Sequence, residues 1–358
     1  DNAREASLPA NAKVLAPRHL TDLVVHLRGE TRLQEITSEA LSAESVMGPD
    51  LSDVRGQHLA KRALEVAAAG KHNLLMIGPP GAGKSMLAAR LPGLLPAMTE
   101  AETLEVAAIH TLNSHAGMTR WGQRPIRSPH HTASSNALAG GGSNPKPGEI
   151  SLAHHGILFL DELPEFPRKV LEVLREPLET GEICISRAAC QVTFPANFQL
   201  IAAMNPCPCG QPEKAPEGCA NPQQCCNKYQ SRLSGPLLDR IDMHLRVEAV
   251  PVSELQKPRQ SSSEGSREIR ERVRVARQRQ LDRCGKANHD LDAQEVDEYC
   301  RLKDSDQQLL AKAVERLGLS ARAYHRVLKV ARTLADLAGD TEITTAAVME
   351  ALSYRTVF

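Results

Sequence analysis

The segment NLLMIGPPGAGKSMLAARL, residues 73–91, carries the pattern that best predicts the fold of this chain. Its apolar residues 74–77 are typical of a short buried strand. Residues 78–85 fit the motif G-x-x-x-x-G-K-[ST], and a run with helical periodicity follows. A Gly/Pro-rich turn that happens to carry a lysine is the alternative. The complete motif between a strand and a helix instead indicates a phosphate-binding loop.

The residue types of this loop suit a nucleoside triphosphate bound with Mg²⁺. Glycines let the backbone wrap around phosphate, and the amino end of the following helix adds partial positive charge. We expect the Lys84 ammonium to neutralise the β- and γ-phosphates and the Ser85 hydroxyl to bind Mg²⁺. The predicted ATP-binding residues are Gly78, Pro79, Pro80, Gly81, Ala82, Gly83, Lys84 and Ser85, with Asp161 on the metal.

Two further apolar runs end in polar side chains that suit hydrolysis. GILFLDE, residues 156–162, ends in Asp161 and Glu162. We expect Asp161 to support Mg²⁺ and Glu162 to orient or deprotonate the attacking water. FQLIAAMN, residues 198–205, ends in Asn205, whose amide is expected to reach the γ-phosphate or that water. The alternatives are a pair of solvated charges and an amide that caps a proline turn.

Short apolar runs alternate with helical patterns between residues 51 and 250. This alternation predicts an α/β fold whose parallel sheet is buried on both faces, and the loop makes it a P-loop NTPase core, an αβα sandwich. Residues 251–268 are expected to form a flexible linker because they are rich in Ser, Pro and charged residues. Residues 269–358 have helical periodicity throughout and predict an all-α lid domain.

Residues 1–30 are predicted to hold a strand and a short amphipathic helix, which cannot bury a core alone. We interpret them as the end of a domain that continues outside this sequence, and residues 31–50 as a linker. The chain starts without Met and without the features of a signal peptide. It is therefore interpreted as a piece of a longer cytoplasmic protein. No apolar run approaches the roughly 20 residues of a membrane span, so no membrane partner is expected.

The composition restricts the classes of partner. The 358 residues include 43 basic and 43 acidic side chains, so the formal net charge is zero. This balance argues against a broadly basic nucleic-acid binder, although it leaves a local basic lining open.

Five of the nine cysteines lie close together, at Cys207, Cys209, Cys219, Cys225 and Cys226. The loop that carries them is poor in apolar residues, and a tetrahedral zinc would supply folding free energy that packing cannot. We therefore predict a structural zinc held by four of these five thiolates. Free thiols and redox chemistry are the alternatives.

Four blocks closely resemble the ComM family, which comprises magnesium-chelatase-like AAA+ ATPases linked to bacterial natural transformation. They are residues 127–166, the NPCPCG stretch 205–210, RLSGPLLDRID at 232–242 and LSARAYHRVLKVARTLADL at 319–337. The resemblance covers essentially the whole chain, and residues 2–29 look like the end of that family's Lon-protease-like N-terminal domain. It implies ATP-driven DNA unwinding and branch migration by a homo-hexameric ring. Asn221 departs from the family pattern, which puts the fourth zinc ligand in doubt.

The resemblance also implies roles for two arginines. Arg240 resembles the arginine finger that acts on the neighbouring subunit's nucleotide, with Arg232 as the substitute. Arg322 resembles the sensor-2 arginine that reaches the γ-phosphate from the lid. A guanidinium placed on the transferred phosphoryl group is worth about 10³–10⁵ in rate. The alternative for each arginine is a surface salt bridge.

Two segments are expected to line a central channel and to track single-stranded or branched DNA. They are the insert at about residues 118–148 and a hairpin predicted from GEICISRAACQVTFP, residues 181–195. The predicted DNA-contacting residues are Arg127, His130, His131, Lys146 and Arg187. Backbone contacts of this kind require no base specificity. Structural loops with solvated charges are the alternative.

Two other classes of function fit parts of the pattern. A magnesium-chelatase-type motor that remodels a protein partner would use the same core, since a fold does not fix a function. A scaffold that binds ATP without hydrolysing it would not need Asp161, Glu162 and Asn205.

Overall fold

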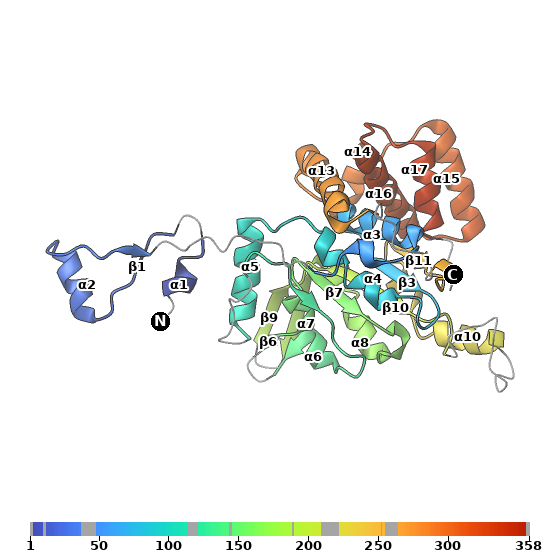
Figure 1. Cartoon of the computed structure of the whole chain (residues 1–358). Helices are drawn as coiled ribbons and strands as arrows, with labels where there is room; N and C mark the ends of the chain where they lie inside the picture. The colour runs from blue at the N-terminus through green and yellow to red at the C-terminus, as the bar shows by residue number, and fades with distance from the viewer. Residues whose placement is uncertain are drawn as a thin grey trace. The chain divides into compact units, whose positions relative to one another are not determined.

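The computed structural model describes residues 3–9, 12–36, 48–113, 121–142, 145–187, 190–208, 222–251, 253–254 and 264–355. The chain forms two compact units, one of residues 1–46 and 97–124 and the other of residues 47–96 and 125–358. Figure 1 shows that the larger unit combines a sheet with a group of C-terminal helices.

The larger unit is built on one five-stranded parallel sheet. Its strands, in spatial order, are β11 (Met243–Arg246), β3 (Leu74–Ile77), β10 (Gln199–Met204), β7 (Ile157–Leu160) and β4 (Ile126–Arg127). Every residue of β3 and β10 is buried, as expected for strands covered on both faces. The α/β prediction is confirmed.

Residues alternate along these strands between two apolar cores. One core also contains side chains of α3 (His58–Gly70) and of the C-terminal helices, and its strand residues are Leu74, Met76, Ile157, Ile201, Met243 and Leu245. The other contains side chains of α8 (Arg168–Val173), and its strand residues are Leu75, Ile77, Leu158, Leu160, Leu200 and Ala202. Each buried Leu or Ile contributes about 1.5–3 kcal/mol, so the αβα sandwich rests on both cores.

The C-terminal part of this unit is helical, as predicted. Its helices are α13 (Ser266–Cys284), η5 (Asn288–Asp290), α14 (Ala293–Tyr299), α15 (Asp304–Leu317), α16 (Ala321–Ala338) and α17 (Thr345–Ser353). Ser320 caps α16 by accepting a hydrogen bond from the Ala323 N–H at 3.2 Å. Gly339, with a φ of 89°, ends this helix in the left-handed conformation that glycine favours. Helices α13 and α16 pack on α3.

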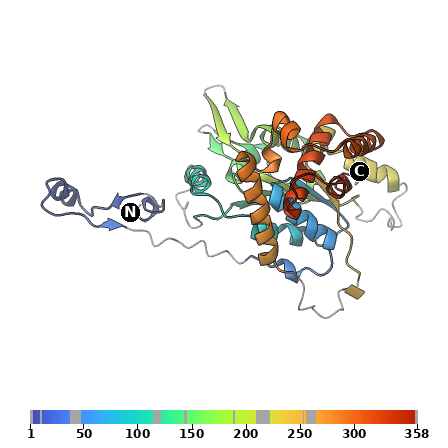
Figure 2. The ribbon, with the colours of Figure 1, turned by 90° about the horizontal axis from the view of Figure 1, so that it is seen from above.

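Short elements connect the strands of the larger unit. Those before β7 in the chain are η1 (Leu51–Asp53), α4 (Lys84–Ala88), η2 (Leu91–Leu94), α6 (Ser135–Ala139), β5 (Gly140–Gly141), β6 (Lys146–Pro147) and α7 (Glu149–Leu152). Those after β7 are η3 (Leu163–Glu165), α9 (Pro177–Thr180), β8 (Glu182–Arg187), β9 (Cys190–Pro195), α10 (Pro222–Gln230) and α11 (Gly235–Leu238). Strands β8 and β9 form the predicted antiparallel hairpin. Figure 2 shows this hairpin, in yellow-green, projecting from the body of the unit.

The smaller unit contains α1 (Ala3–Ala6), β1 (Val14–Leu15), α2 (Leu20–Leu27), β2 (Glu35–Ile36) and α5 (Glu100–Thr111). The strand and the helix predicted near the N-terminus correspond to β1 and α2. Strand β2 pairs with β1 inside the stretch 31–50 that we expected to be only a linker. A two-residue strand leaves no period in the sequence, which explains this difference. None of the helices in the described ranges is long and apolar enough to cross a membrane.

Candidate nucleotide site

The sheet order brings the predicted site residues to one edge. Strand β10 lies between β3 and β7, and all three run parallel. The chain therefore leaves the sheet at Gly78, Asp161 and Asn205 along the same carboxyl edge. Ligands of open α/β sheets bind at this edge.

The phosphate-binding loop needs its glycines for two different reasons. Gly81 and Gly83 have φ values of 78° and 91°, which disfavour any residue with a side chain. A Cβ atom at Gly78 would lie 2.1 Å from the carbonyl oxygen of Val247, so this position admits no side chain. Gln57 braces the loop by donating hydrogen bonds to the carbonyl oxygens of Ala82, at 3.3 Å, and Glu248.

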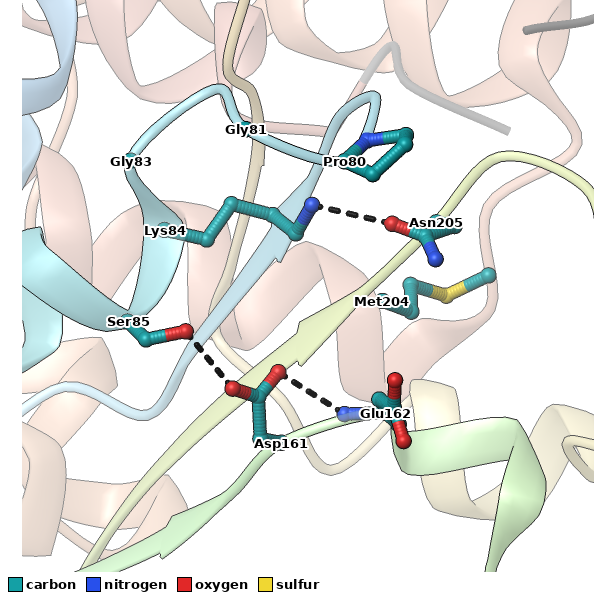
Figure 3. Close-up of a pocket in the computed structure, with 9 residues that line it drawn as sticks. All are labelled: Pro80, Gly81, Gly83, Lys84, Ser85, Asp161, Glu162, Met204 and Asn205. Carbon is teal, nitrogen blue, oxygen red and sulfur yellow. Dashed lines mark hydrogen bonds between the residues drawn. The ribbon is translucent and has the colours of Figure 1, made fainter. Parts of the chain in front are cut away.

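The ammonium group of Lys84 lies inside the loop. Its Nζ donates to the carbonyl oxygens of Gly78 at 2.7 Å and Pro79 at 2.9 Å, and to Asn205 Oδ1 at 3.0 Å. Figure 3 shows this side chain pointing toward Asn205. All three acceptors are neutral, so no direct ion pair consumes the charge. Burial lowers the pKa of Lys84, and the nearby carboxylates of Asp161 and Glu162 act in the opposite direction.

The two predicted Mg²⁺ ligands touch each other. The Ser85 hydroxyl donates to Asp161 Oδ2 at 2.6 Å, and the Glu162 N–H donates to Asp161 Oδ1 at 2.9 Å. A hydroxyl beside a carboxylate offers the hard oxygen ligands that Mg²⁺ prefers. These residues therefore fit the metal that the loop predicts.

Glu162 has a strained backbone. Its φ is 53°, in the left-handed region, at the junction between β7 and η3. Strain of this kind costs about 1–3 kcal/mol and gathers at functional sites. The carboxylate is exposed, and its Oε2 lies 3.2 Å from Nδ1 of His131. A single cavity is lined by Pro80, Gly81, Gly83, Lys84, Ser85, Asp161, Glu162, Met204 and Asn205.

The two predicted phosphate-sensing arginines lie elsewhere. Arg240 precedes β11, and its backbone oxygen lies 3.4 Å from Asn73 Nδ2, just before β3. It therefore belongs to the amino edge of the sheet, opposite the edge that carries Lys84. Arg240 is buried and pairs with Glu179 at 2.6 Å, and the same carboxylate lies 3.5 Å from the exposed Arg322.

The substitute arginine finger and the predicted DNA contacts lie at separate places in the larger unit. Arg232 pairs with Glu165 at 2.9 Å. Arg127 is held by Glu149 through contacts of 2.5 and 2.6 Å, so its charge is compensated. His130 and Lys146 are exposed. Arg187 ends β8, and its side chain is outside the described part.

The cysteine loop is described only in part. Cys207 and Cys226 are buried, and Cys225 is half-buried. Cys209 and Cys219 lie outside the described residues. The zinc site stays a prediction.

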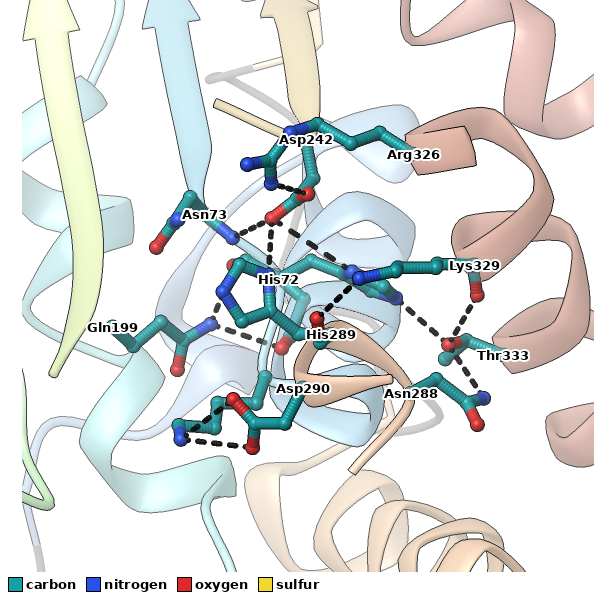
Figure 4. A network of polar contacts seen from close by, with 12 residues as sticks. His72, Asn73, Gln199, Asp242, Asn288, His289, Asp290, Arg326, Lys329 and Thr333 are labelled. Carbon is teal, nitrogen blue, oxygen red and sulfur yellow. Dashed lines mark hydrogen bonds and ion pairs between the residues drawn. The ribbon is translucent and has the colours of Figure 1, made fainter. Parts of the chain in front are cut away.

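A second polar cluster joins the sheet to the helical lid (Figure 4). Asp242, before β11, accepts a hydrogen bond from the Asn73 N–H at 2.7 Å and binds Arg326 at 2.5 Å and His289 at 2.8 Å. His72 Nε2 lies 2.7 Å from Thr333 Oγ1. Burial alone would raise the pKa of Asp242, but the charges of His289 and Arg326 hold it well below its usual range.

In this structure the cluster is an ionic network. Ligand atoms of His72, Asp242 and His289 do lie within 4.8 Å of one another. However, Arg326 already supplies the cation that the Asp242 carboxylate needs, and Lys329 adds a second positive charge beside it. The cluster therefore fastens the lid to the amino edge of the sheet.

Sequence reasoning missed two contributors to these sites. Gln57 has a left-handed φ of 53° and reaches the loop from the start of α3. The Gly-Gln pair that precedes a helical run is the sequence signal that could have indicated the role of Gln57. Glu179 gives no signal in the sequence, because its partners lie 61 or more residues further along the chain.

Comparisons with known proteins agree with the class that this geometry defines. The family model described as magnesium chelatase, subunit ChlI, matches residues 50–255, and the one described as subunit ChlI C-terminal matches residues 263–355. Fold and site are those of a magnesium-chelatase-like AAA+ protein, a class that implies ATP and Mg²⁺ as the ligands of the loop.

Individual relatives narrow the class. The chain is 50% identical over 361 residues to competence protein ComM of Haemophilus influenzae, across 99% of this chain and 70% of that protein. It is 47% identical to the protein YifB of Escherichia coli, across 100% of this chain and 70% of that protein. The chloroplastic magnesium-chelatase subunit ChlI of Nicotiana tabacum is 26% identical over 56% of this chain and 41% of its own length. The chain belongs to the ComM/YifB family.

Proposed function

We propose that this protein is an ATP-driven, ring-forming DNA motor that unwinds DNA or migrates branches while DNA is integrated in natural transformation. The observation that carries the ATPase part is the meeting of Lys84, Ser85, Asp161, Glu162 and Asn205 in one cavity. The DNA part rests on 50% identity to a protein named for competence.

Each residue of the cavity has a separate task in this proposal. Lys84 exchanges its three neutral oxygen partners for phosphate oxygens, which are better acceptors because they are charged. Ser85 and Asp161 would hold Mg²⁺, which when bound would neutralise the charge that develops on the phosphate. Glu162 orients the attacking water, and Asn205 links the γ-phosphate to strand β10.

The arginine finger acts between protomers. Arg240 lies at the amino edge of the sheet, so it does not serve the nucleotide held at the carboxyl edge of its own chain. A head-to-tail ring would bring Arg240 of one protomer to the loop of the next, and such interfaces close when the rotation permits. We propose a hexamer in which Arg322, as the sensor-2 arginine, reaches the γ-phosphate together with Arg240.

The ring is proposed to track the phosphate backbone of single-stranded or branched DNA. The proposed contacts are Lys146, His130, His131 and the β8–β9 hairpin with Arg187. Arg127 joins them only if it leaves Glu149. A zinc held by Cys207 and three of its neighbours is proposed as a staple beside β10, with no catalytic role.

The decisive experiment is a titration of the ATPase rate against single-stranded DNA at two salt concentrations, together with strand displacement. Stimulation by DNA that weakens at high salt supports the motor, because phosphate contacts release counterions. The Glu162→Gln variant should bind ATP but lose about 10²-fold or more in turnover. Strand displacement at the normal rate by that variant would refute the mechanism.

A second function is a motor that remodels a protein partner. The two magnesium-chelatase family models, which together span most of the chain, favour it. Such a motor would hydrolyse ATP at a rate that DNA does not change.

A further inference from the structure

Glu179 belongs to α9 and stands three residues before strand β8. Its side chain is 40% exposed, and its two oxygens contact arginines from two other parts of the chain. Oε2 accepts a hydrogen bond from Arg240 Nη2 at 2.6 Å, and Oε1 lies 3.5 Å from Nε of Arg322. One carboxylate thus holds both proposed phosphate-sensing arginines.

Arg240 depends on this carboxylate for its charge balance. Its side chain is 6% exposed, and its Nη1 donates to the carbonyl oxygen of Pro236 at 2.7 Å. Among the described residues, Glu179 is the only carboxylate that pairs with Arg240, and Nε of Arg240 has no hydrogen-bond partner. The hydrogen bond from Arg240 lowers the pKa of Glu179, and the charges of Arg240, Arg322 and Arg326 add to this effect against burial.

The lid keeps Arg322 beside Arg240. The Ser320 hydroxyl, at the start of α16, donates to Asp239 Oδ2 at 3.0 Å. Arg326, a turn further along α16, binds Asp242 at 2.5 Å. The first two turns of α16 are therefore fastened to the segment that carries Arg240, so both guanidinium groups face the same carboxylate.

Glu179 is also tied to the base of the hairpin. Gly181, two residues further on, accepts a hydrogen bond from the Ala196 N–H at 2.7 Å, just beyond β9. The Thr180 hydroxyl lies 3.1 Å from the carbonyl oxygen of Glu182, the first residue of β8. A displacement of α9 would therefore reach both strands of the hairpin.

We infer that Glu179 is a positioning residue that couples the arginine pair to the β8–β9 hairpin. The inference rests on the proposed function, because it takes Arg240 as the finger. Phosphate oxygens of the neighbouring protomer's nucleotide carry more negative charge than one carboxylate and compete for the same N–H groups. When they bind Arg240, Glu179 loses its partner, and the base of the hairpin is released.

The test is hydrogen exchange of the β8 and β9 amides in the full chain, with and without Mg²⁺ and a slowly hydrolysed ATP analogue. In the wild type, nucleotide should speed exchange at the hairpin about ten-fold, the change expected when one charge-assisted hydrogen bond is lost. In Glu179→Gln, exchange should already be fast, and nucleotide should add nothing. Glu179→Asp, which keeps the charge at shorter reach, should fall between them.

Two further variants complete the test. Glu182→Gln removes the next exposed carboxylate along the chain and should behave as the wild type. Arg240→Ala should mimic Glu179→Gln, and the double variant should show no additional change, since both remove the same contact. Thermal unfolding of each variant confirms that it is folded.

A nucleotide response of normal size in folded Glu179→Gln would overturn the inference. The inference would also be overturned if nucleotide left hydrogen exchange at the wild-type hairpin unchanged while the protein still displaced DNA strands. In that case the proposed function would stand. If hydrogen exchange at the hairpin responds to nucleotide as expected but the protein displaces no DNA strands, the coupling stands and the proposed DNA-motor function is refuted.

Discussion

Nδ1 of His131 lies 3.2 Å from Oε2 of Glu162, so the segment after β4 reaches the residue proposed to orient the attacking water. His131 is also one of the predicted DNA contacts. It stands between the exposed His130, whose ring centroid is 4.1 Å away, and the hydrolytic site. The insert and the site therefore share one side chain.

We expect His131→Ala to lower the kcat of ATP hydrolysis about ten-fold and to leave the KM for ATP unchanged, because the carboxylate of Glu162 loses its orienting partner. His131→Asn, which keeps a hydrogen-bond donor, should recover part of the loss. His130→Ala is the matched control. Steady-state kinetics would contradict this role if His131→Ala changed only KM.

Lys84→Ala should weaken ATP binding about 100-fold, because the ammonium is the charge that the loop offers to phosphate. Fluorescent-nucleotide titration measures this loss directly. Lys169→Ala, on the exposed face of α8, is the control and should bind as the wild type. An unchanged affinity of Lys84→Ala for ATP would show that this loop is not the nucleotide site.

Arg240→Ala should bind ATP but fail to hydrolyse it. If the finger acts between protomers, mixing Arg240→Ala with Lys84→Ala restores turnover, because some interfaces pair an intact loop with an intact finger. Random mixing in equal amounts gives such a pair at about a quarter of the interfaces of a ring. Mixtures as inactive as the separate variants would show that Arg240 does not act in trans.

Acid should destabilise the fold from about pH 6.5 downward. Burial lowers the pKa of His72 and of His244 to about 3, so both stay neutral when folded. The unfolded chain takes up these protons below about pH 6.5, and stability falls by about 1.4 kcal/mol per pH unit for each histidine. Urea midpoints between pH 7 and 4.5 measure the slope.

His72→Asn should remove about half of this slope, and His58→Asn, at an exposed position, should leave it unchanged. Comparing slopes avoids the general loss of stability that follows any change at a buried site. A slope that His72→Asn does not alter would show that this histidine is protonated in the folded state.

Protein purified without chelator should contain about one zinc per chain, since structural sites of this kind bind a single tetrahedral ion. The Cys207→Ser/Cys209→Ser pair should lose it, and Cys284→Ser should keep it. Wild-type protein that contains no zinc would refute the proposed zinc site in the cysteine loop.

The carboxyl edge of the sheet was predictable because its chemistry is encoded locally. A motif of fixed spacing marks the loop at Gly78–Ser85, and each apolar run ends directly in its polar residue, at Asp161 and Asn205. The amino edge was not predictable in the same way. Arg240 was recognised by resemblance, but its burial against Glu179 depends on packing between segments 61 residues apart.

The ionic network around Asp242 has a mechanical consequence. It ties α16 to the starts of β11 and β3 through a buried ion pair, whose disruption costs about 3–5 kcal/mol. A hinge at this place would have to break that pair on every cycle of hydrolysis. The sheet and its helical cap should therefore travel as a rigid block, and strokes of the ring should arise where one block slides or pivots against the next.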